Sequence, residues 1–140
     1  MTRLVVPEGV RRPLLLWGFM ATGKSTVGRR IAELAGVAHE DLDARIEREA
    51  GASIAELFRS RGESGFRELE ARALGALLAD LGPRVVSLGG GTLLPRTARL
   101  SALERSVVVC LTASAEAIAA RTDGDPSRPL LGAKDRGARI

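Results

Sequence analysis

The sequence GFMATGKS occupies residues 18–25, directly after the apolar run LLLW at residues 14–17. It matches the pattern G-x-x-x-x-G-K-[ST] at every fixed position. Glycines in such a loop let backbone N–H groups turn toward phosphate oxygens, and a helix that begins at Lys24 points its positive end at the same anion. The Lys24 ammonium can reach the outer phosphates, and the Ser25 hydroxyl can ligate Mg²⁺. These residues therefore predict a loop that binds nucleotide phosphates.

The segments around this loop alternate between strand and helix patterns. We expect strands at residues 14–17, 37–39, 85–88 and 107–111, and helices at residues 24–35, 63–81, 97–103 and 115–121. In the first helix, Val27, Ile31 and Leu34 are expected to form the apolar face. Ser53 and Glu56 have the spacing of a capping box, which predicts a short helix before the longest one.

This alternation predicts an α/β fold, with a parallel sheet and helices on both faces. Right-handed crossovers then bring the carboxyl ends of the strands, and the ligand site, to one edge of the sheet. The strand at residues 107–111 is apolar enough to be buried, but residues 134–140 form a basic tail without a further strand. This strand would then be internal to the sheet or a bare apolar edge. We expect one domain over residues 1–140, with its last strand and helix missing.

The composition is that of an ordinary globular domain, because 45% of the 140 residues are hydrophobic and 27% are charged. No apolar run reaches the length of a membrane span, and we expect neither a signal peptide nor a membrane partner. The single cysteine, Cys110, excludes a disulfide within this chain and indicates a cytoplasmic protein. The net charge is +4, but three Phe and one Trp are few for stacking on bases, so we expect no nucleic-acid partner.

Asp41 and Asp43 flank Leu42 at the end of the second expected strand. A spacing of two puts both side chains on one face of an extended segment. Two carboxylates in one cleft suit Mg²⁺, held through water, and a substrate hydroxyl. Asp43 alone also fits the N-cap of a helix over residues 44–50, and this alternative does not exclude the first.

Glycine and arginine residues mark further candidate elements. Gly89–Gly91 follows a strand and can let the backbone approach a ligand closely, although a flexible turn would have the same sequence. Arg67 can grip a carboxylate with two hydrogen bonds, or it can lie on the surface as a solvated charge. Arg121 and Arg128 bracket a loop, which fits either a lid over a transferring phosphate or two surface charges.

Taken together, these elements resemble shikimate kinase, a family of P-loop small-molecule kinases. The resemblance is carried by GFMATGKST (18–26), DLD (41–43), GESGFRELE (62–70), SLGGGT (87–92) and SRPLL (127–131). It implies a three-layer P-loop kinase fold and an enzyme that transfers the γ-phosphate of ATP to the 3-hydroxyl of shikimate. That reaction belongs to chorismate and aromatic amino acid biosynthesis.

The resemblance also implies roles for individual residues. ATP would be bound by Gly18, Ala21, Thr22, Gly23, Lys24, Ser25, Thr26, Arg121 and Arg128. Shikimate would contact Asp43, Phe58, Phe66, Arg67, Gly89, Gly90 and Gly91. Mg²⁺ would be held by Ser25 and, through water, by Asp41. Catalysis would involve Lys24, Asp43 as the candidate base, and Arg128 in a lid over about residues 122–135.

Two features depart from the family's pattern. The fourth residue of the phosphate loop, usually glycine, is Ala21, and we expect it to be tolerated if its φ is negative. The family continues beyond Ile140 with a helix that bears a second shikimate-binding arginine, whose loss would cost about 2–3 kcal/mol of substrate binding. We expect a monomer or part of a longer fused chain.

Two alternatives stay open. One is a non-catalytic domain of this fold that senses a ligand, and the other is a different small-molecule kinase, such as a gluconate kinase. The presence of Lys24, Ser25 and Asp43 argues against the first, and the glycine turn with the Phe66-Arg67 pair argues against the second.

Overall fold

The computed structural model describes residues 12–19, 21–80 and 82–122. The strands are β1 (Leu14–Trp17), β2 (Ala38–Asp41), β3 (Arg84–Ser87) and β4 (Val107–Cys110). The helices are α1 (Lys24–Ala35), α2 (Leu42–Ala50), α3 (Ile54–Ala79), α4 (Arg96–Arg105) and α5 (Ala115–Thr122). None of these helices is both long enough and apolar enough to cross a bilayer.

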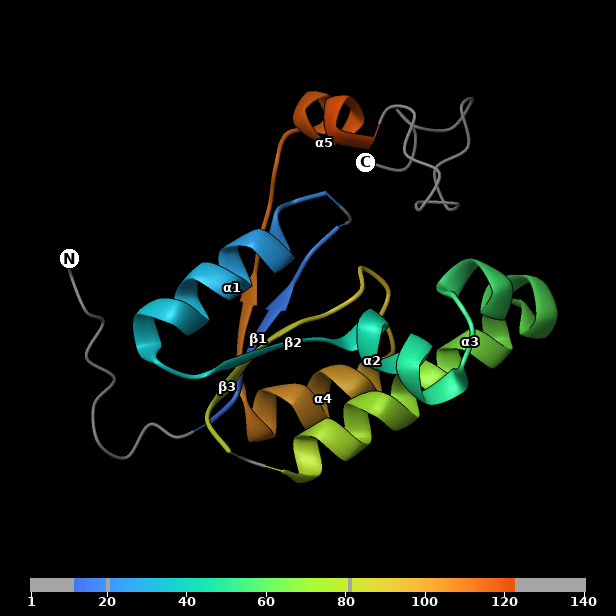
Figure 1. Ribbon diagram of the computed structural model, residues 1–140, viewed down its shortest axis with the longest axis horizontal. Coiled ribbons are helices and arrows are strands. Elements are labelled where there is room, and N and C mark those ends of the chain that lie inside the picture. The colour runs from blue at the N-terminus through green and yellow to red at the C-terminus, as the bar shows by residue number, and fades with distance from the viewer. Residues whose placement is uncertain (1–11, 20, 81, 123–140) are drawn as a thin grey trace.

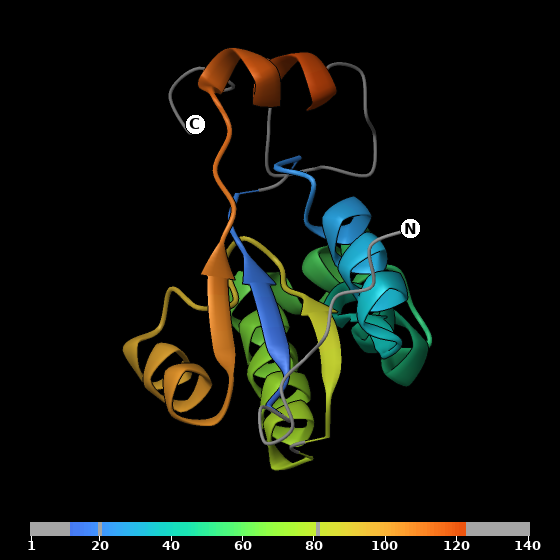
Figure 2. The ribbon, with the colours of Figure 1, turned by 90° about the vertical axis from the view of Figure 1, so that its left-hand side faces the viewer.

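The four strands form one parallel sheet in the order β2-β3-β1-β4. β1 lies between β3 and β4, and Leu15 is in register with Val86 of β3 and Val108 of β4. Figure 1 and Figure 2 show that α5 lies beyond the carboxyl ends of the strands, at the end of an extended connection from β4. The predicted α/β fold with a parallel sheet is confirmed.

Successive strand residues point to opposite faces of the sheet, which creates two apolar layers. Leu15 and Val86 belong to a cluster with residues of α2, α3 and α4. Leu16 and Val85 belong to a second cluster with residues of α1. Helices therefore cover both faces, as predicted, with α1 on one side of the sheet in Figure 1 and α3 and α4 on the other.

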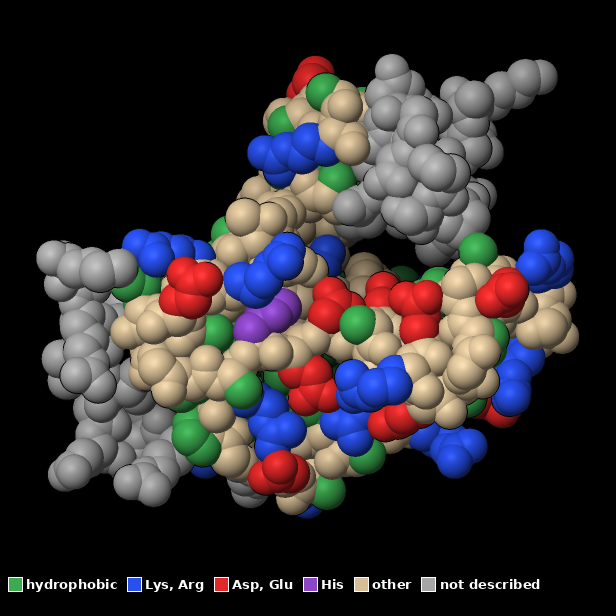
Figure 3. Space-filling view, in the orientation of Figure 1, with side chains coloured by type: hydrophobic (Ala, Val, Ile, Leu, Met, Phe, Trp, Pro, Cys, Tyr) green, Lys and Arg blue, Asp and Glu red, His purple; other side chains and the backbone are tan. Residues whose placement is uncertain are grey.

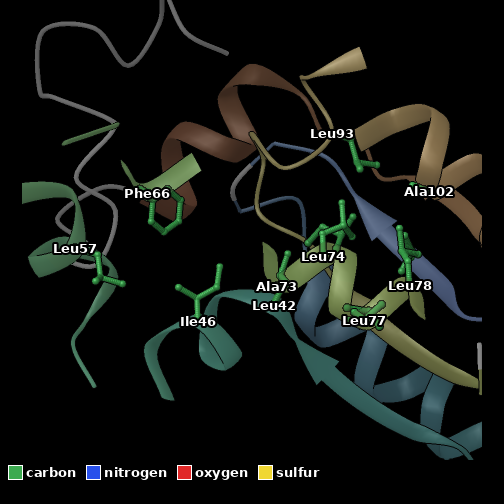
Figure 4. Packing of buried hydrophobic residues seen from close by; sticks show 13 residues of the cluster. Leu42, Ile46, Leu57, Phe66, Ala73, Leu74, Leu77, Leu78, Leu93 and Ala102 are labelled. Atoms are coloured by element: carbon green, nitrogen blue, oxygen red, sulfur yellow. The ribbon is translucent and has the colours of Figure 1, made fainter. Parts of the chain in front are cut away.

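The larger layer is built on the second half of α3 (Figure 4). Phe66, Ala73, Leu74, Leu77 and Leu78 recur at about one helical turn and are all buried. Packing of this apolar face contributes most of the stability of a helix in a folded protein. The buried face also fixes the rotation of α3 about its axis, and with it the positions of its polar side chains.

The buried face of α1 agrees with the prediction at Ile31, which packs against the second cluster, and differs from it at Val27. Gly28 and Ala32 are buried, whereas Val27 is 37% exposed. A Cβ at position 28 would lie 2.8 Å from Nε2 of His39 and 2.9 Å from Oγ of Ser87, so any other residue there would force these side chains to move. The apolar spacing did not identify Gly28 and Ala32, because these small residues let α1 lie close to the sheet.

β4 is an edge strand among the described residues. Val107 and Val109 are 44% and 40% exposed, so the prediction of a buried strand at this position is wrong. The sequence left two positions open for this strand, inside the sheet or at an apolar edge, and the structure places it at the edge. Apolar side chains alone could not decide between these places, because the neighbours of a strand are set by the topology of the whole sheet.

α3 begins with the predicted capping box and bends at Gly62. The hydroxyl of Ser53 accepts a hydrogen bond from the N–H of Glu56, and the Glu56 carboxylate accepts one from the N–H of Ser53. Gly62 has φ 70° and ψ 178°, so two helical runs meet there at a kink. This kink lies directly before the predicted start of the long helix.

Two glycines of α3 provide a matched test of the kink. Gly62→Ala places a side chain at positive φ and is expected to lower the free energy of unfolding by about 1 kcal/mol. Gly75→Ala adds a Cβ with no atom within 4 Å, in the regular part of the helix, and is expected to raise it by about 0.5–1 kcal/mol. Urea denaturation monitored by circular dichroism measures both, and effects of the same sign would contradict the kink.

Candidate active site

The loop between β1 and α1 is folded around the side chain of Lys24. Its Nζ donates to the carbonyl oxygens of Gly18 and Phe19, each at 2.8 Å, and Oγ1 of Thr22 donates to the Phe19 oxygen at the same distance. The N-cap of α1 is Gly23, which has φ 93° and no side chain to cap the helix. The first turn of α1 can therefore offer backbone N–H groups and the positive end of the helix to an anion.

Ala21, in the same loop, adopts a φ of +61°. Its tolerance was predicted on the condition of a negative φ, and this condition is not met. A left-handed conformation costs an alanine about 1–2 kcal/mol, because Cβ approaches the following carbonyl oxygen. The Ala21 carbonyl accepts a hydrogen bond of 2.8 Å from Nη1 of Arg121, which connects α5 to the loop.

A cleft of about 1230 Å³ lies at the carboxyl edge of the sheet. The predicted site residues that line it are Ala21, Thr22, Gly23, Lys24, Ser25, Thr26, Asp41, Asp43, Phe58, Phe66, Arg67, Gly89, Gly90, Gly91 and Arg121. Gly18 does not line the cleft, although its carbonyl binds Lys24. Arg128 and residues 123–135 of the predicted lid lie outside the described residues. The structure thus brings together residues from both halves of the chain.

Asp41 ends β2 and caps α2. Its Oδ2 accepts a hydrogen bond from Oγ of Ser25 at 2.9 Å, and its Oδ1 accepts one from the N–H of Ala44 at 3.1 Å. Asp43 lies in the first turn of α2, so an extended segment through both aspartates is wrong, and so is Asp43 as the N-cap. Asp41 takes the capping role because the strand ends there, and the helix places Asp43 in the same cleft.

Acidic side chains surround Asp43, and they gather over α2 in Figure 3. The pKa of Asp43 is raised to about 6, first because burial penalises its charged form and then because Asp41, Glu70 and Glu47 carry like charges. Lys24 acts in the opposite direction. Glu47 was not predicted, although it follows Asp43 by one helical turn and so shares its side of α2.

Arg67 is held by a carboxylate that was not predicted either. Its Nη1 donates to Oε2 of Glu70 at 2.7 Å, and Oε1 of Glu70 accepts a hydrogen bond from Oγ1 of Thr92 at 2.6 Å. Glu70 is buried, with 3% exposure. Arg67 also lies over the ring of Phe66, which stacks on Phe58 at 4.3 Å. The i,i+3 spacing of arginine and glutamate in the sequence contained a signal for this pair.

The Gly89–Gly91 turn uses all three of its carbonyl oxygens inside the protein. The donors, in order, are the N–H of Thr92 at 3.2 Å, Nε1 of Trp17 at 3.1 Å and the N–H of Leu94 at 3.2 Å. Within the described part of the chain, the three amide N–H groups of the turn have no hydrogen-bond partner. A Cβ on the last glycine would overlap the guanidinium of Arg67. The turn thus offers N–H donors beside a cation, an arrangement that suits an anion.

The cleft is also lined by residues that the sequence did not assign to the site, among them Glu47, Ser53, Ile54, Ala55, Glu70, Leu88 and Leu94. Of the apolar ones, Leu88 belongs to the larger core cluster and Ile54 packs against it. One end of the cleft can bind phosphate and the other a carboxylate, with Asp43 available to a hydroxyl group. This arrangement can transfer a phosphoryl group from a nucleotide to an acidic alcohol.

Known proteins share this sequence and architecture. A family model described as shikimate kinase matches residues 20–140. The shikimate kinase of Geobacter sulfurreducens is 48% identical over 120 residues, which cover 86% of this chain and 66% of that protein. The chain spans about two thirds of the length of the curated relatives it matches.

Solved structures agree with the fold. A shikimate kinase from Acinetobacter baumannii, in complex with shikimate, is 37% identical with a TM-score of 0.86, over 91% of this chain and 71% of that one. A gluconokinase from Sinorhizobium meliloti is 22% identical with a TM-score of 0.52, over 86% and 71%, which shows similarity of the fold alone. The three-layer P-loop kinase fold is confirmed.

Asp43→Asn tests the cost of burying this carboxyl group. Its folded pKa of about 6 exceeds the ordinary 3.8, so its contribution to stability is fully present below about pH 4 and is lost as the pH rises to about 6. We compare the free energy of unfolding of the variant with that of the wild type at each pH. This difference is expected to be more favourable to the variant at pH 7 than at pH 4 by on the order of 2–3 kcal/mol. Urea denaturation at both pH values measures this difference.

Asp80→Asn is the control for that experiment. Arg84 lowers the pKa of the exposed Asp80, so this carboxylate contributes stability above its ordinary pKa and loses it as the pH falls. The control variant is therefore expected to be destabilised at pH 7, opposite in sign to Asp43→Asn. If the free energies of unfolding of both variants, each relative to the wild type, changed in the same direction between pH 4 and pH 7, the cause assigned to the raised pKa of Asp43 would be contradicted.

Proposed function

Because the chain belongs to the shikimate kinase family, we propose that it transfers the γ-phosphate of ATP to the 3-hydroxyl group of shikimate. One observation carries the proposal: the phosphate loop, Asp43 and the Arg67–Glu70 pair line the same cleft. A nucleotide triphosphate and a hydroxy acid are the two ligands that these groups suit.

ATP would lie with its phosphates at the start of α1. Lys24 already points its Nζ at the carbonyls of the loop, and it would turn to the terminal phosphates when they enter. The backbone N–H groups after Gly23 would bind phosphate oxygens. Arg121 lines the cleft from α5, and we assign it to the adenine side of the nucleotide.

Mg²⁺ would be held by Ser25 and, through water, by Asp41; the Oγ and Oδ2 atoms of these residues are 2.9 Å apart. One hydroxyl and one carboxylate fit this ion, because it keeps several waters and takes further ligands from phosphates. No cluster of three or more acidic, His or Cys side chains suited to a metal occurs within residues 12–19, 21–80 and 82–122. When bound, the ion neutralises negative charge on the phosphates.

Shikimate would lie between Arg67 and Asp43. The guanidinium would bind the shikimate carboxylate, with Glu70 fixing its orientation through the 2.7 Å bond. The free amide N–H groups of Gly89–Gly91 would add donors for the same anion. The stacked rings of Phe58 and Phe66 would form the apolar wall of this end of the cleft.

Asp43 would receive the proton of the acceptor hydroxyl. In the step, the 3-oxygen of shikimate forms a bond to the γ-phosphorus, the bond from that phosphorus to the bridging oxygen of ADP breaks, and the proton passes to Asp43. A pKa of about 6 leaves this carboxylate mostly ionised at neutral pH and able to take the proton. Lys24 would stabilise the charge on the transferred group.

Arg128 and the lid at about residues 122–135 enter the proposal only through the resemblance of the sequence. Arg128 would neutralise phosphate charge in the closed site. The state of the protein, a monomer or part of a longer fused chain, and its cytoplasmic location also stay predictions.

The proposal is tested by the release of ADP from ATP and Mg²⁺ with shikimate, with gluconate, or without an acceptor. We expect release that depends on shikimate, and a loss of at least about 100-fold for Lys24→Ala, which removes the phosphate-binding ammonium. Release at the same rate without an acceptor would contradict the kinase assignment. Dependence on gluconate would support the other kinase class, and binding of shikimate without turnover would support the sensing domain.

Variants of the Arg67–Glu70 pair test the acceptor end. Arg67→Ala is expected to raise the KM for shikimate about 30- to 150-fold, because a charged hydrogen-bond partner worth about 2–3 kcal/mol is lost. Glu70→Gln keeps an acceptor for Thr92 but weakens the hold on Arg67, so a smaller rise is expected. The KM for ATP serves as the internal control, and an equal rise in both KM values would contradict these roles.

A further inference from the structure

Trp17 joins the central strand of the sheet to the glycine turn. It is the last residue of β1, directly before the phosphate loop, and its backbone is in register with Cys110 of β4. Its carbonyl oxygen accepts a hydrogen bond of 2.7 Å from the N–H of Leu111. Its indole Nε1–H donates to the carbonyl oxygen of Gly90 at 3.1 Å, across 73 residues of sequence. The indole is thus fixed at its backbone and directed at the turn.

The indole contact determines which way one peptide unit of the turn points. The chain has no cis peptide bonds among the described residues, so the Gly90 C=O and the Gly91 N–H point in opposite directions. Trp17 does not line the cleft, whereas Gly90 and Gly91 do. With the carbonyl bound to Trp17, the Gly91 N–H is directed away from the indole, and Arg67 lies against the same glycine.

Trp17 is also the only donor that holds the Gly90 carbonyl within the described part of the chain. The carbonyls on either side of it bind backbone N–H groups of the next turn, a local contact that any sequence could make. The Gly90 carbonyl instead depends on a side chain, and glycine flanks it with no side chain to restrain the peptide. A Leu or Val at position 17 would supply no donor.

We infer that Trp17 is a positioning residue for the acceptor: its indole N–H orients the Gly90–Gly91 peptide so that the Gly91 amide can bind the anionic end of the substrate beside Arg67. The inference rests on the proposed phosphorylation of shikimate. Trp17 would thus affect the affinity for the acceptor although it lies outside the cleft. Because Trp17 is also the last residue before the phosphate loop, one residue connects the nucleotide end of the site to the acceptor end.

The test removes the indole N–H while keeping the ring. Trp17→Phe removes the N–H donor but also makes the ring smaller. Replacement of the Trp17 side chain by a benzothiophene analogue keeps the size of the ring and removes only the donor. Both are expected to raise the KM for shikimate about three- to tenfold, the range for one neutral hydrogen bond, with kcat and the KM for ATP within about twofold of the wild type. A purely structural role would change all three constants together.

A second readout does not depend on turnover. Trp17 is the only tryptophan of the chain, so its indole signals are unambiguous. The indole N–H is expected to exchange with solvent at least about tenfold more slowly than in the unfolded chain. Replacement of the donor is expected to shift the Gly91 amide ¹⁵N resonance more than the resonance of Gly75, which is far along α3.

The outcomes separate this inference from the proposed function. If the wild type shows no shikimate-dependent turnover or binding, the proposed function fails and the inference falls with it. If the wild type phosphorylates shikimate while the benzothiophene variant keeps an unchanged KM for shikimate, only the inference is overturned. A selective rise in that KM, together with the shift at Gly91, would support it.

Discussion

The pairing of β1 with a parallel strand on each side is the constraint on which the cleft depends. Because all four strands run in one direction, the phosphate loop, Asp41, the Gly89–Gly91 turn and the connection to α5 all leave the sheet at the same edge. Reversal of one strand would move one of these groups to the opposite edge. Backbone hydrogen bonds therefore assemble the site, and side chains refine it.

Close contacts under the phosphate loop keep it in place. Ser87, at the end of β3, donates from its Oγ to the carbonyl of Lys24 at 3.1 Å. Because that hydroxyl proton is used, Nε2 of His39, which is 2.9 Å away, must be the donor to Ser87. Gly28 leaves the space that this pair occupies. The first turn of α1 is thus supported from the side of the sheet, which limits its movement.

Two kinds of feature were predicted correctly from the sequence. The limits of α1, the capping box at Ser53 and the break before the long helix are local, because neighbouring residues determine them. The parallel α/β architecture follows from the alternation of strands and helices along the chain. Some of the missed features depend on distant contacts, such as the hydrogen bond from Thr92 to the buried Glu70. Others are local but have no sequence signal that was used, such as the positive φ of Ala21 and the capping of α2 by Asp41. The place of β4 at the edge follows from the strand order, which no local pattern contains.

The carboxylates around Asp43 have a consequence for the end of the proposed reaction. Burial raises the pKa of Asp43 first, and the like charges of Asp41, Glu70 and Glu47 raise it further. In the proposed reaction, the same repulsion would act on the phosphorylated acceptor, which carries about two more negative charges than the acceptor that entered. These charges would weaken the binding of the product and so favour its departure from the cleft.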